Sequence, residues 1–135
     1  MPAKIKETLE SLEPFNFIEF DQDMVSKALA SIKQDSSPGS VGIEAKVFKY
    51  CNEELSPILS RLFNLCLRSG RIPAEWKVAF IKPIPKPKAD KRQVSSYRPI
   101  STLPPIAKVF ESLISRQIEV YFEQNELLSE NQYGF

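Results

Sequence analysis

Residues 78–103 read V-A-F-I-K-P-I-P-K-P-K-A-D-K-R-Q-V-S-S-Y-R-P-I-S-T-L, and we expect the rest of the chain to be organised around them. They contain two short runs rich in β-branched and aromatic residues, Val78 to Ile84 and Tyr97 to Ser101, with a polar segment between them. This pattern predicts two strands joined as an antiparallel hairpin.

The predicted hairpin is strongly cationic. From Lys82 to Arg98 there are six cations and one acid, Asp90, which gives +5 in a chain whose net charge is +1. The rest of the chain therefore sums to −4, and so local a positive patch is a candidate for holding phosphate. The alternative is a solvated hairpin whose lysines only protect its edges from pairing with other strands.

Helical patterns precede the hairpin. Asp21 offers an N-cap for an amphipathic helix over Gln22 to about Lys33, and a shorter helix is expected over Ile43 to Cys51. Between them, residues 35–42 combine serines with glycine and proline, which predicts a turn. Met1 to Phe20 is acidic and ends in P-F-N-F-I-E-F, which fits either a lead-in strand or a linker that docks by its phenylalanines.

Two longer helices are predicted on either side of the hairpin. The first should have Ser56 as its N-cap, Pro57 at its first helical position and Gly70 just past its end. Its apolar stripe is wide, which is typical of a helix buried on more than one side. The last helix opens at Pro105 and follows the 3.6-residue period. We expect the core to contain Trp76, Leu62, Phe63, Phe110 and Leu113.

The amino-acid composition excludes some classes of protein and of binding site. The chain has 135 residues, of which 42% are hydrophobic and 26% charged, as in an ordinary single-domain soluble protein. Cys51 and Cys66 lack metal-ligand spacing and the chain has no histidine, which excludes a zinc site; we expect reduced core thiols. No apolar run reaches the roughly 18 residues of a membrane span and no signal peptide is evident, so an intracellular protein is expected.

The order of several motifs adds a more specific signal. They are S-S-P-G-S-V-G-I at 36–43, G-R-I-P-A-E-W-K at 70–77, I-K-P-I-P-K-P at 81–87, Y-R-P-I-S at 97–101 and N-Q-Y-G-F at 131–135. In this order they resemble the reverse transcriptase of non-LTR (LINE-type) retrotransposons, most closely the jockey and CR1-like branch. One departure is that Ser40 and Val41 replace the proline and aspartate of the family's S-P-G-P-D-G-I.

The resemblance implies an architecture. The fold class is α+β and mainly helical, with helices packed around a short antiparallel β-hairpin, as in the fingers and partial palm of a right-hand polymerase. Residues 1–20 would be an N-terminal lead-in. Residues 21–135 would be a partial reverse transcriptase domain, comprising the fingers and the first part of the palm and ending before the catalytic aspartates.

The resemblance also implies roles for residues of the hairpin. Arg98 matches the fingers arginine that contacts the triphosphate of the incoming nucleotide, and its planar guanidinium suits bidentate phosphate contact. Lys86 matches the companion lysine on the same phosphates, whereas Lys88 stands where the family usually has glycine. Tyr97 would pack beneath the arginine or touch a base. Three further cations would follow the template backbone or lie in solvent: Lys82, Lys91 and Arg92.

No catalytic residue or metal ligand is expected within this chain. The family holds Mg²⁺ or Mn²⁺ on carboxylates that lie beyond the Q-Y-G-F motif, so we predict that the isolated chain does not polymerise. The intact enzyme would work with an RNA template, a DNA primer, deoxynucleoside triphosphates and its remaining palm and thumb. It would act in the cytoplasm and nucleus.

Three functions remain open from the sequence. The leading one is a fragment of an RNA-directed DNA polymerase that contributes contacts to the nucleotide and the template. The second is a non-catalytic nucleic-acid-binding or interaction module derived from such an element. The third is a remnant without activity.

Overall fold

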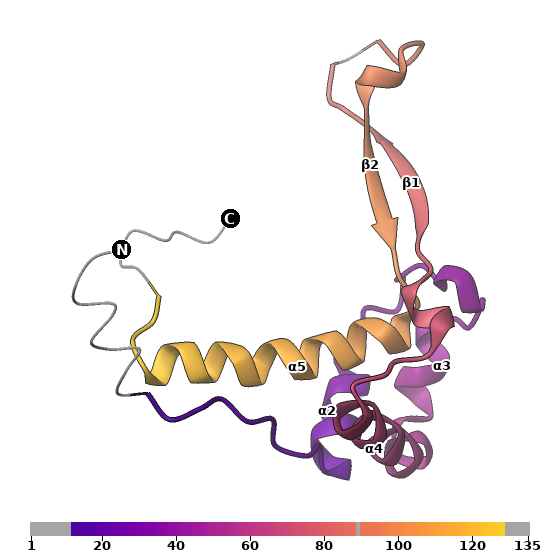
Figure 1. Ribbon diagram of the computed structural model, residues 1–135. Coiled ribbons are helices and arrows are strands. Elements are labelled where there is room, and N and C mark those ends of the chain that lie inside the picture. The colour runs from indigo at the N-terminus through magenta and orange to yellow at the C-terminus, as the bar shows by residue number, and fades with distance from the viewer. Residues whose placement is uncertain (1–11, 89, 129–135) are drawn as a thin grey trace, which may run out of the picture. The chain divides into compact units, whose positions relative to one another are not determined.

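The computed structural model describes residues 12–88 and 90–128, which form four α-helices and one two-stranded antiparallel sheet (Figure 1). The chain divides into two compact units. The larger unit spans residues 19–113, and the smaller unit combines the described residues 12–18 and 114–128. The elements are α2 (Gln22–Ala30), η1 (Gly39–Val41), α3 (Ala45–Tyr50), α4 (Asn52–Ser69), η2 (Ala74–Lys77), β1 (Phe80–Pro85), η3 (Val94–Ser96), β2 (Tyr97–Thr102) and α5 (Pro105–Gln124). The described fold is therefore mostly helical with a small sheet, as predicted.

Helix α2 begins where its capping residue predicted. The Asp21 carboxylate accepts a hydrogen bond from the Met24 backbone N–H at 2.7 Å, which satisfies one of the unpaired donors of the first turn. Val25 and Leu29 are buried on its inner face. The helix ends at Ala30, shorter than predicted.

Helix α4 begins five residues earlier than predicted, at Asn52 with Cys51 as its N-cap, so the assignment of Ser56 as N-cap is wrong. Pro57 lies inside the helix, where its missing N–H would leave the Glu53 carbonyl without a donor. The buried Ser56 hydroxyl donates to that carbonyl at 3.2 Å and replaces the lost bond. At the other end Gly70 adopts a left-handed φ of 63°, as a C-terminal glycine should.

The core of the larger unit is a cluster of aromatic rings. The Phe63 ring lies 5.2 Å from that of Phe110 and 5.8 Å from that of Trp76, measured between ring centroids. Phe20 meets Phe63 edge to face at 6.5 Å. All four are buried together with Leu113, which confirms most of the predicted core, but Leu62 is only half-buried.

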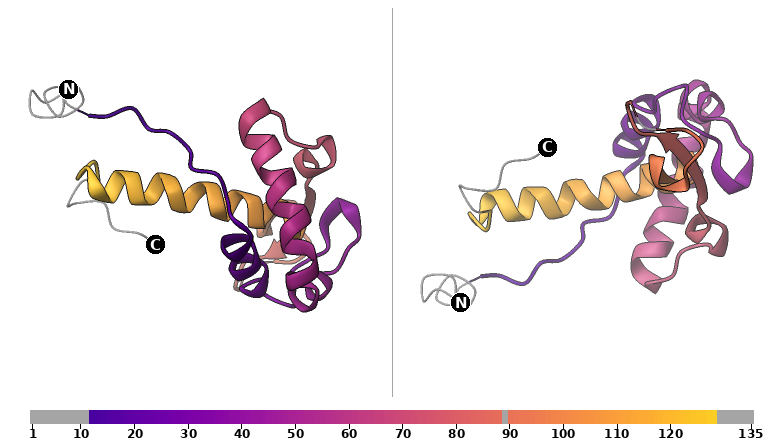
Figure 2. Two further views of the ribbon diagram at one scale, coloured as in Figure 1. Left: turned by 90° about the horizontal axis from the view of Figure 1, so that it is seen from below. Right: turned by 90° about the horizontal axis from the view of Figure 1, so that it is seen from above.

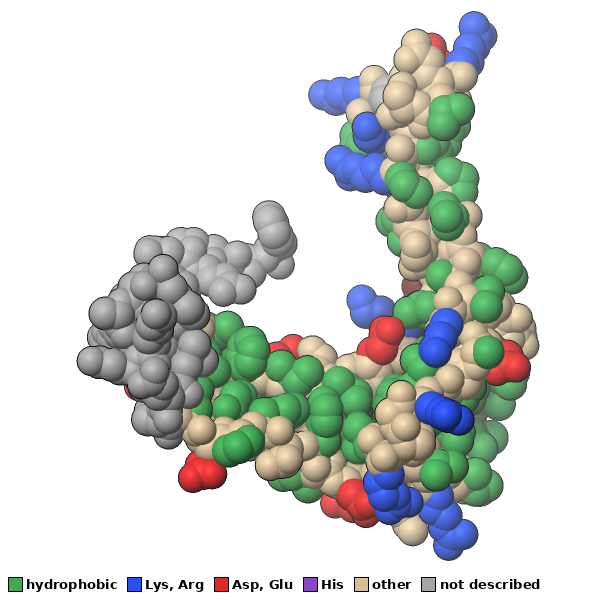
Figure 3. Space-filling view, in the orientation of Figure 1, with side chains coloured by type: hydrophobic (Ala, Val, Ile, Leu, Met, Phe, Trp, Pro, Cys, Tyr) green, Lys and Arg blue, Asp and Glu red, His purple; other side chains and the backbone are tan. Residues whose placement is uncertain are grey.

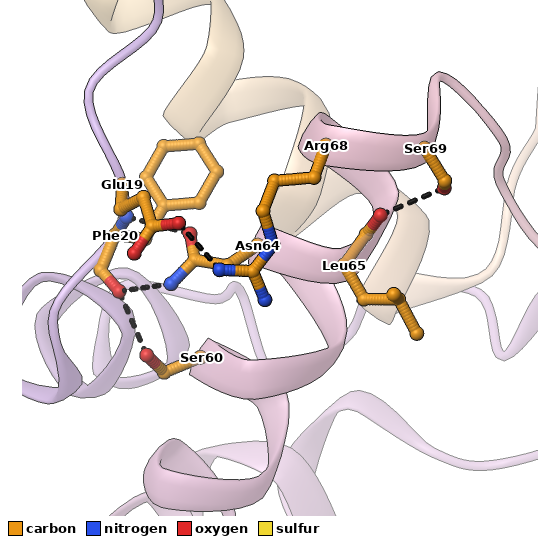
Figure 4. A network of polar contacts seen from close by, with 7 residues as sticks. All are labelled: Glu19, Phe20, Ser60, Asn64, Leu65, Arg68 and Ser69. Atoms are coloured by element: carbon orange, nitrogen blue, oxygen red, sulfur yellow. Dashed lines mark hydrogen bonds and ion pairs between the residues drawn. The ribbon is translucent and has the colours of Figure 1, made fainter.

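Phe20 is fixed by its backbone as well as by its ring. Figure 4 shows the Asn64 side-chain amide facing the Phe20 backbone, donating to its carbonyl at 2.9 Å and accepting from its N–H at 2.8 Å. The Ser60 hydroxyl donates to the same carbonyl at 2.7 Å, and Arg68 pairs with Glu19 at 2.6 Å. This end of the lead-in segment is therefore a docked linker and not a strand.

The smaller unit holds its part of the lead-in segment by a similar contact. The Gln117 side-chain amide donates to the Ile18 carbonyl at 2.7 Å and accepts from the Ile18 N–H at 2.8 Å. The Tyr121 hydroxyl donates to the Glu13 carbonyl at 2.8 Å, and its ring meets Phe15 at 5.1 Å.

The two cysteines differ. Cys66 is buried in α4, and burial raises the pKa of its thiol. Cys51 is exposed, so the prediction of a core thiol is wrong for this residue.

The hairpin is not the centre of the packing, which corrects the predicted architecture. Every residue of β1 is exposed, and in β2 only the two end residues are partly covered. The aromatic cluster closes the core without the sheet, and Figure 1 shows the two strands projecting from the helices of their unit. Strand β1 begins at Phe80, two residues after its predicted start, and β2 ends at Thr102, one residue after its predicted end.

Candidate nucleic-acid interface

The turn at residues 38–42 holds the base of the hairpin. Gly39 has a φ of +63° and lies so close to the end of β2 that a Cβ there would stand 2.6 Å from the Pro104 nitrogen. The Ser40 hydroxyl lies 3.2 Å from the carbonyl oxygens of both Glu75 and Val78, just before β1. The turn thus contacts both ends of the hairpin, and Ser40, which departs from the family motif, is one of its contact residues.

The strand register separates the hairpin into two chemically distinct faces. Phe80 pairs with Thr102 and Pro85 with Tyr97, and the Lys86 N–H donates to the Ser96 carbonyl at 2.7 Å, which extends the ladder by one pair. Paired residues share a face and successive residues alternate between faces. One face therefore carries Lys82, Lys86 and Arg98 with Phe80, Ile84 and Ile100. The opposite face carries Ile81, Pro83, Pro85, Tyr97, Pro99 and Ser101, with no charge.

Arg98 lies between the two lysines of the cationic face. It pairs with Ile84, so Lys82 and Lys86 are its two diagonal neighbours across the strands. Diagonal neighbours are about 7–8 Å apart, within the reach of one polyphosphate for side chains this long. Neither Lys82 nor Arg98 forms an ion pair with any residue in 12–88 or 90–128. Their charges are thus available to a ligand.

Lys86 and Tyr97 both contact the tip of the hairpin. The Lys86 ammonium donates to the Ser95 carbonyl at 2.9 Å, which leaves two of its three N–H donors for other acceptors. The Tyr97 hydroxyl donates to the Lys91 carbonyl at 2.9 Å. Because Tyr97 precedes Arg98 in the strand, its ring lies on the opposite face.

The tip carries the remaining cations on an ordered turn. The Asp90 carboxylate accepts from the Arg92 N–H at 3.0 Å, so the one acid of the hairpin is used in folding the tip. Lys91 and Arg92 are exposed, and Figure 3 shows lysine and arginine side chains gathered at the free end of the hairpin. Lys88 has a φ of 60°, a left-handed backbone conformation that glycine adopts without strain.

Sequence reasoning missed two of the residues that shape this site. Ser40 was visible only as a departure from a motif, and the Ser95 carbonyl gave no signal because backbone acceptors are present at every residue. The spacing of Lys82, Lys86 and Arg98 does place them on one face, but only once the register of the two strands is known.

The described residues offer neither a metal-binding group nor a membrane-spanning helix. Within the ranges 12–88 and 90–128, no three histidine, cysteine, aspartate or glutamate side chains form a group able to hold a metal ion. Of the helices in these ranges, none has the length and apolarity to cross a bilayer.

Known proteins resemble this chain over most of its length. A probable RNA-directed DNA polymerase from the X-element transposon of Drosophila melanogaster is 33% identical over 116 residues, 86% of this chain and 13% of the relative. The corresponding protein of transposon BS from the same species is 30% identical over 96% of this chain and 15% of the relative. This chain is a relative of the non-LTR retrotransposon polymerases. The RNA-directed DNA polymerase of the mobile element jockey, also from D. melanogaster, is 28% identical over 82% of the chain.

The match covers a small part of each retrotransposon polymerase. The chain spans 12–15% of the length of these three relatives. No family model matches it. The resemblance inferred from the motifs is confirmed by these relatives.

Proposed function

We propose that this chain is the part of a retrotransposon reverse transcriptase that contacts the incoming nucleotide and the template through the cationic face of its hairpin. The observation that carries the proposal is the placement of Arg98 diagonally between Lys82 and Lys86 on one exposed face. The Arg98 guanidinium and the Lys86 ammonium at this spacing suit the oxygens of a triphosphate, and Lys82 extends the same cationic face beyond them.

The two parts of the hairpin would have different roles. Arg98 and Lys86 would bind the phosphates of the nucleotide, with Lys86 also held by the Ser95 carbonyl. Lys88, Lys91 and Arg92 at the tip, with Lys82, would follow the phosphates of the template strand. Such contacts bind any sequence, because phosphates carry no base information.

The remaining components of the reaction would come from the longer polymerase. Mg²⁺ or Mn²⁺, held on carboxylates of the palm, would lower the charge of the triphosphate during nucleotidyl transfer. The DNA primer and RNA template would bind between this part, the remaining palm and the thumb. The enzyme would act inside the cell, in the cytoplasm and the nucleus.

Binding to a labelled single-stranded RNA, with deoxynucleoside triphosphate as competitor, tests the proposal in the isolated chain. Lys82→Gln/Arg98→Gln should weaken binding and flatten the plot of log affinity against log salt concentration, by about 0.7 in slope for each phosphate that the protein no longer neutralises. Lys27→Gln/Lys46→Gln is the matched control, since it removes the same charge from two exposed lysines of α2 and α3. Equal binding by the two double variants would contradict a specific role for the hairpin face.

A non-catalytic nucleic-acid-binding module is the second candidate. The observation in its favour is that the tip is folded by its own contacts, Lys86 to Ser95 and Tyr97 to Lys91. The face could therefore bind nucleic acid without the rest of a polymerase. Primer extension on an RNA template with Mg²⁺ or Mn²⁺ separates the two: we expect no synthesis by the isolated chain and nucleotide incorporation by a longer polymerase that contains it.

A further inference from the structure

Helix α4 has a second apolar stripe that the described residues cover only in part, because Leu55 and Leu62 are half-buried and Ile58 and Leu65 are exposed. Leu55, Ile58, Leu62 and Leu65 follow one another at spacings of three, four and three residues. Ile58 is 64% exposed and Leu65 is 56% exposed, whereas Leu59 and Phe63 on the other side are buried. The left view of Figure 2 shows α4 crossing the near side of its unit.

The spacing indicates what kind of surface fits the stripe. Apolar residues that alternate at three and four positions form the narrow seam of a two-helix contact, in which each side chain inserts between side chains of a facing helix. A flat or irregular partner has no need of this periodicity. The sequence also predicts that α4 is buried on more than one side, and the described residues bury only one of them.

We propose that the occupant of this stripe is α4 of a second copy of the chain, packed antiparallel. Leu55 and Leu62 occupy one kind of heptad position, and Ile58 and Leu65 occupy the other. When two such helices pack in opposite directions, each kind faces the other kind on the partner. Leu55 then faces the partner's Leu65, and Ile58 faces the partner's Leu62. Each of these two pairings forms an apolar layer, and the two-fold symmetry places the same layer on the other side of the axis.

The charges that flank the stripe favour the antiparallel direction. The first turn of α4 is acidic, with Glu53 and Glu54, and the last turn carries Arg68. Antiparallel packing brings Glu54 near the partner's Arg68 at both ends, where the guanidinium that pairs with Glu19 of its own chain has further donors, and it pairs the opposite ends of the helix dipoles. Parallel packing would instead set the like ends of the two helix dipoles side by side. Arg61, near the middle, meets its counterpart across the axis and can extend its long side chain into water.

The contact is short, so the pair is weak. An 18-residue helix with four apolar layers buries much less than a standard stable interface, and we expect a dissociation constant between about 1 mM and 1 μM. This inference does not depend on the proposed function of the hairpin.

Sedimentation equilibrium of the 135-residue chain between about 1 μM and 1 mM, the range set by those affinities, tests for the pair. We expect a concentration-dependent dimer that Leu65→Glu weakens at least about tenfold, the effect of 1.4 kcal/mol. The matched control is Val94→Glu, which changes a side chain that is 91% exposed in η3 and should leave association unchanged. A chain that stays monomeric at every concentration, or that loses association equally with Val94→Glu, overturns the proposal.

Disulfide trapping tests the direction of the pair. In a Cys51→Ser background, Ile58→Cys and Leu62→Cys chains are mixed and oxidised mildly. Antiparallel packing predicts disulfides between the two different chains at a yield well above that within either variant alone. Preferential disulfides between identical variants, or a random distribution of disulfides, would contradict the proposed pair. If the stripe is covered only in a longer polypeptide, a helix of that polypeptide and not a second copy is its occupant, which also contradicts the proposal.

Discussion

The aromatic core and the hairpin use similar residues in opposite ways. Phe63 is fully buried against other rings, whereas Phe80 at the start of β1 is 56% exposed. Ile81 is 69% exposed, although isoleucine is among the residue types most often buried. The helices therefore supply the stability of the larger unit, and the hairpin is left free to carry uncompensated charge. Mutations in the two regions should separate folding from binding.

The largest expected effect is in the core. Phe63→Ala should cost about 3–5 kcal/mol of unfolding free energy, because it removes the ring that three other aromatic rings contact. Ile81→Ala in the hairpin should change it by less than about 0.5 kcal/mol. Urea unfolding followed by circular dichroism measures both. A similar loss for the two variants would show that the hairpin is part of the folding core.

The base of the hairpin should be the next most sensitive place. Gly39→Ala should cost at least about 2 kcal/mol, since left-handed backbone alone costs an alanine about 1–2 kcal/mol and the new Cβ would also meet the Pro104 backbone. Gly42→Ala is the control, because Gly42 has a φ of +75° but open space around its Cβ position. Because both variants put an alanine at a positive φ, the difference between their melting temperatures measures the cost of the contact between the new Cβ at residue 39 and the backbone just after β2. Identical melting temperatures would mean that the turn does not fix the base.

Arg98 should matter for binding and not for folding. Arg98→Ala should lose roughly 1.5–3 kcal/mol of nucleotide binding, or about one to two decades in affinity. Its melting temperature should be unchanged, because the arginine is exposed. Arg98→Lys should recover only part of the affinity, since a point charge lacks the bidentate geometry. The nucleotide KM of a longer polymerase carrying these changes measures the effect, and an unchanged KM and turnover for Arg98→Ala would leave this arginine as a solvated surface residue.

The smallest expected effect concerns the tip. Lys88→Gly should stabilise the tip slightly, by up to about 1 kcal/mol, because relief of the left-handed strain outweighs the added freedom of the unfolded chain. Amide hydrogen exchange at residues 90–96 would detect the change. Lys91→Gly, which removes a cation without a positive φ, is the control and should not slow exchange. Faster exchange in Lys88→Gly would show that the lysine side chain itself orders the tip.

Much of the fold could be predicted because its signals are local. Asp21 and Gly70 mark helix ends through contacts with their own neighbours, and the predicted strands lie within two residues of β1 and β2. The start of α4 could not be predicted, because the Ser56 hydroxyl repairs the hydrogen bond that Pro57 removes. The hairpin was predicted to be the centre of the packing, and this is wrong. A sequence shows which residues are apolar, but it does not show whether aromatic rings from the helices already fill the core. Arg98 and Lys86 came from the family motif, and their common face required the register.

The position of the prolines in the hairpin has a consequence for how the exposed sheet behaves in solution. Pro83 faces Pro99, and since neither has an N–H, this pair cannot be hydrogen-bonded to each other. By alternation, the backbone groups of Ile81, Pro85, Tyr97 and Ser101 also point outward. The Tyr97 N–H is bonded to the Val94 carbonyl, which leaves only Ile81 and Ser101 with free outward donors along the two strands. An approaching strand therefore finds outward carbonyl acceptors but too few N–H donors for a continuous ladder, which protects the exposed ribbon from aggregation by edge-to-edge growth.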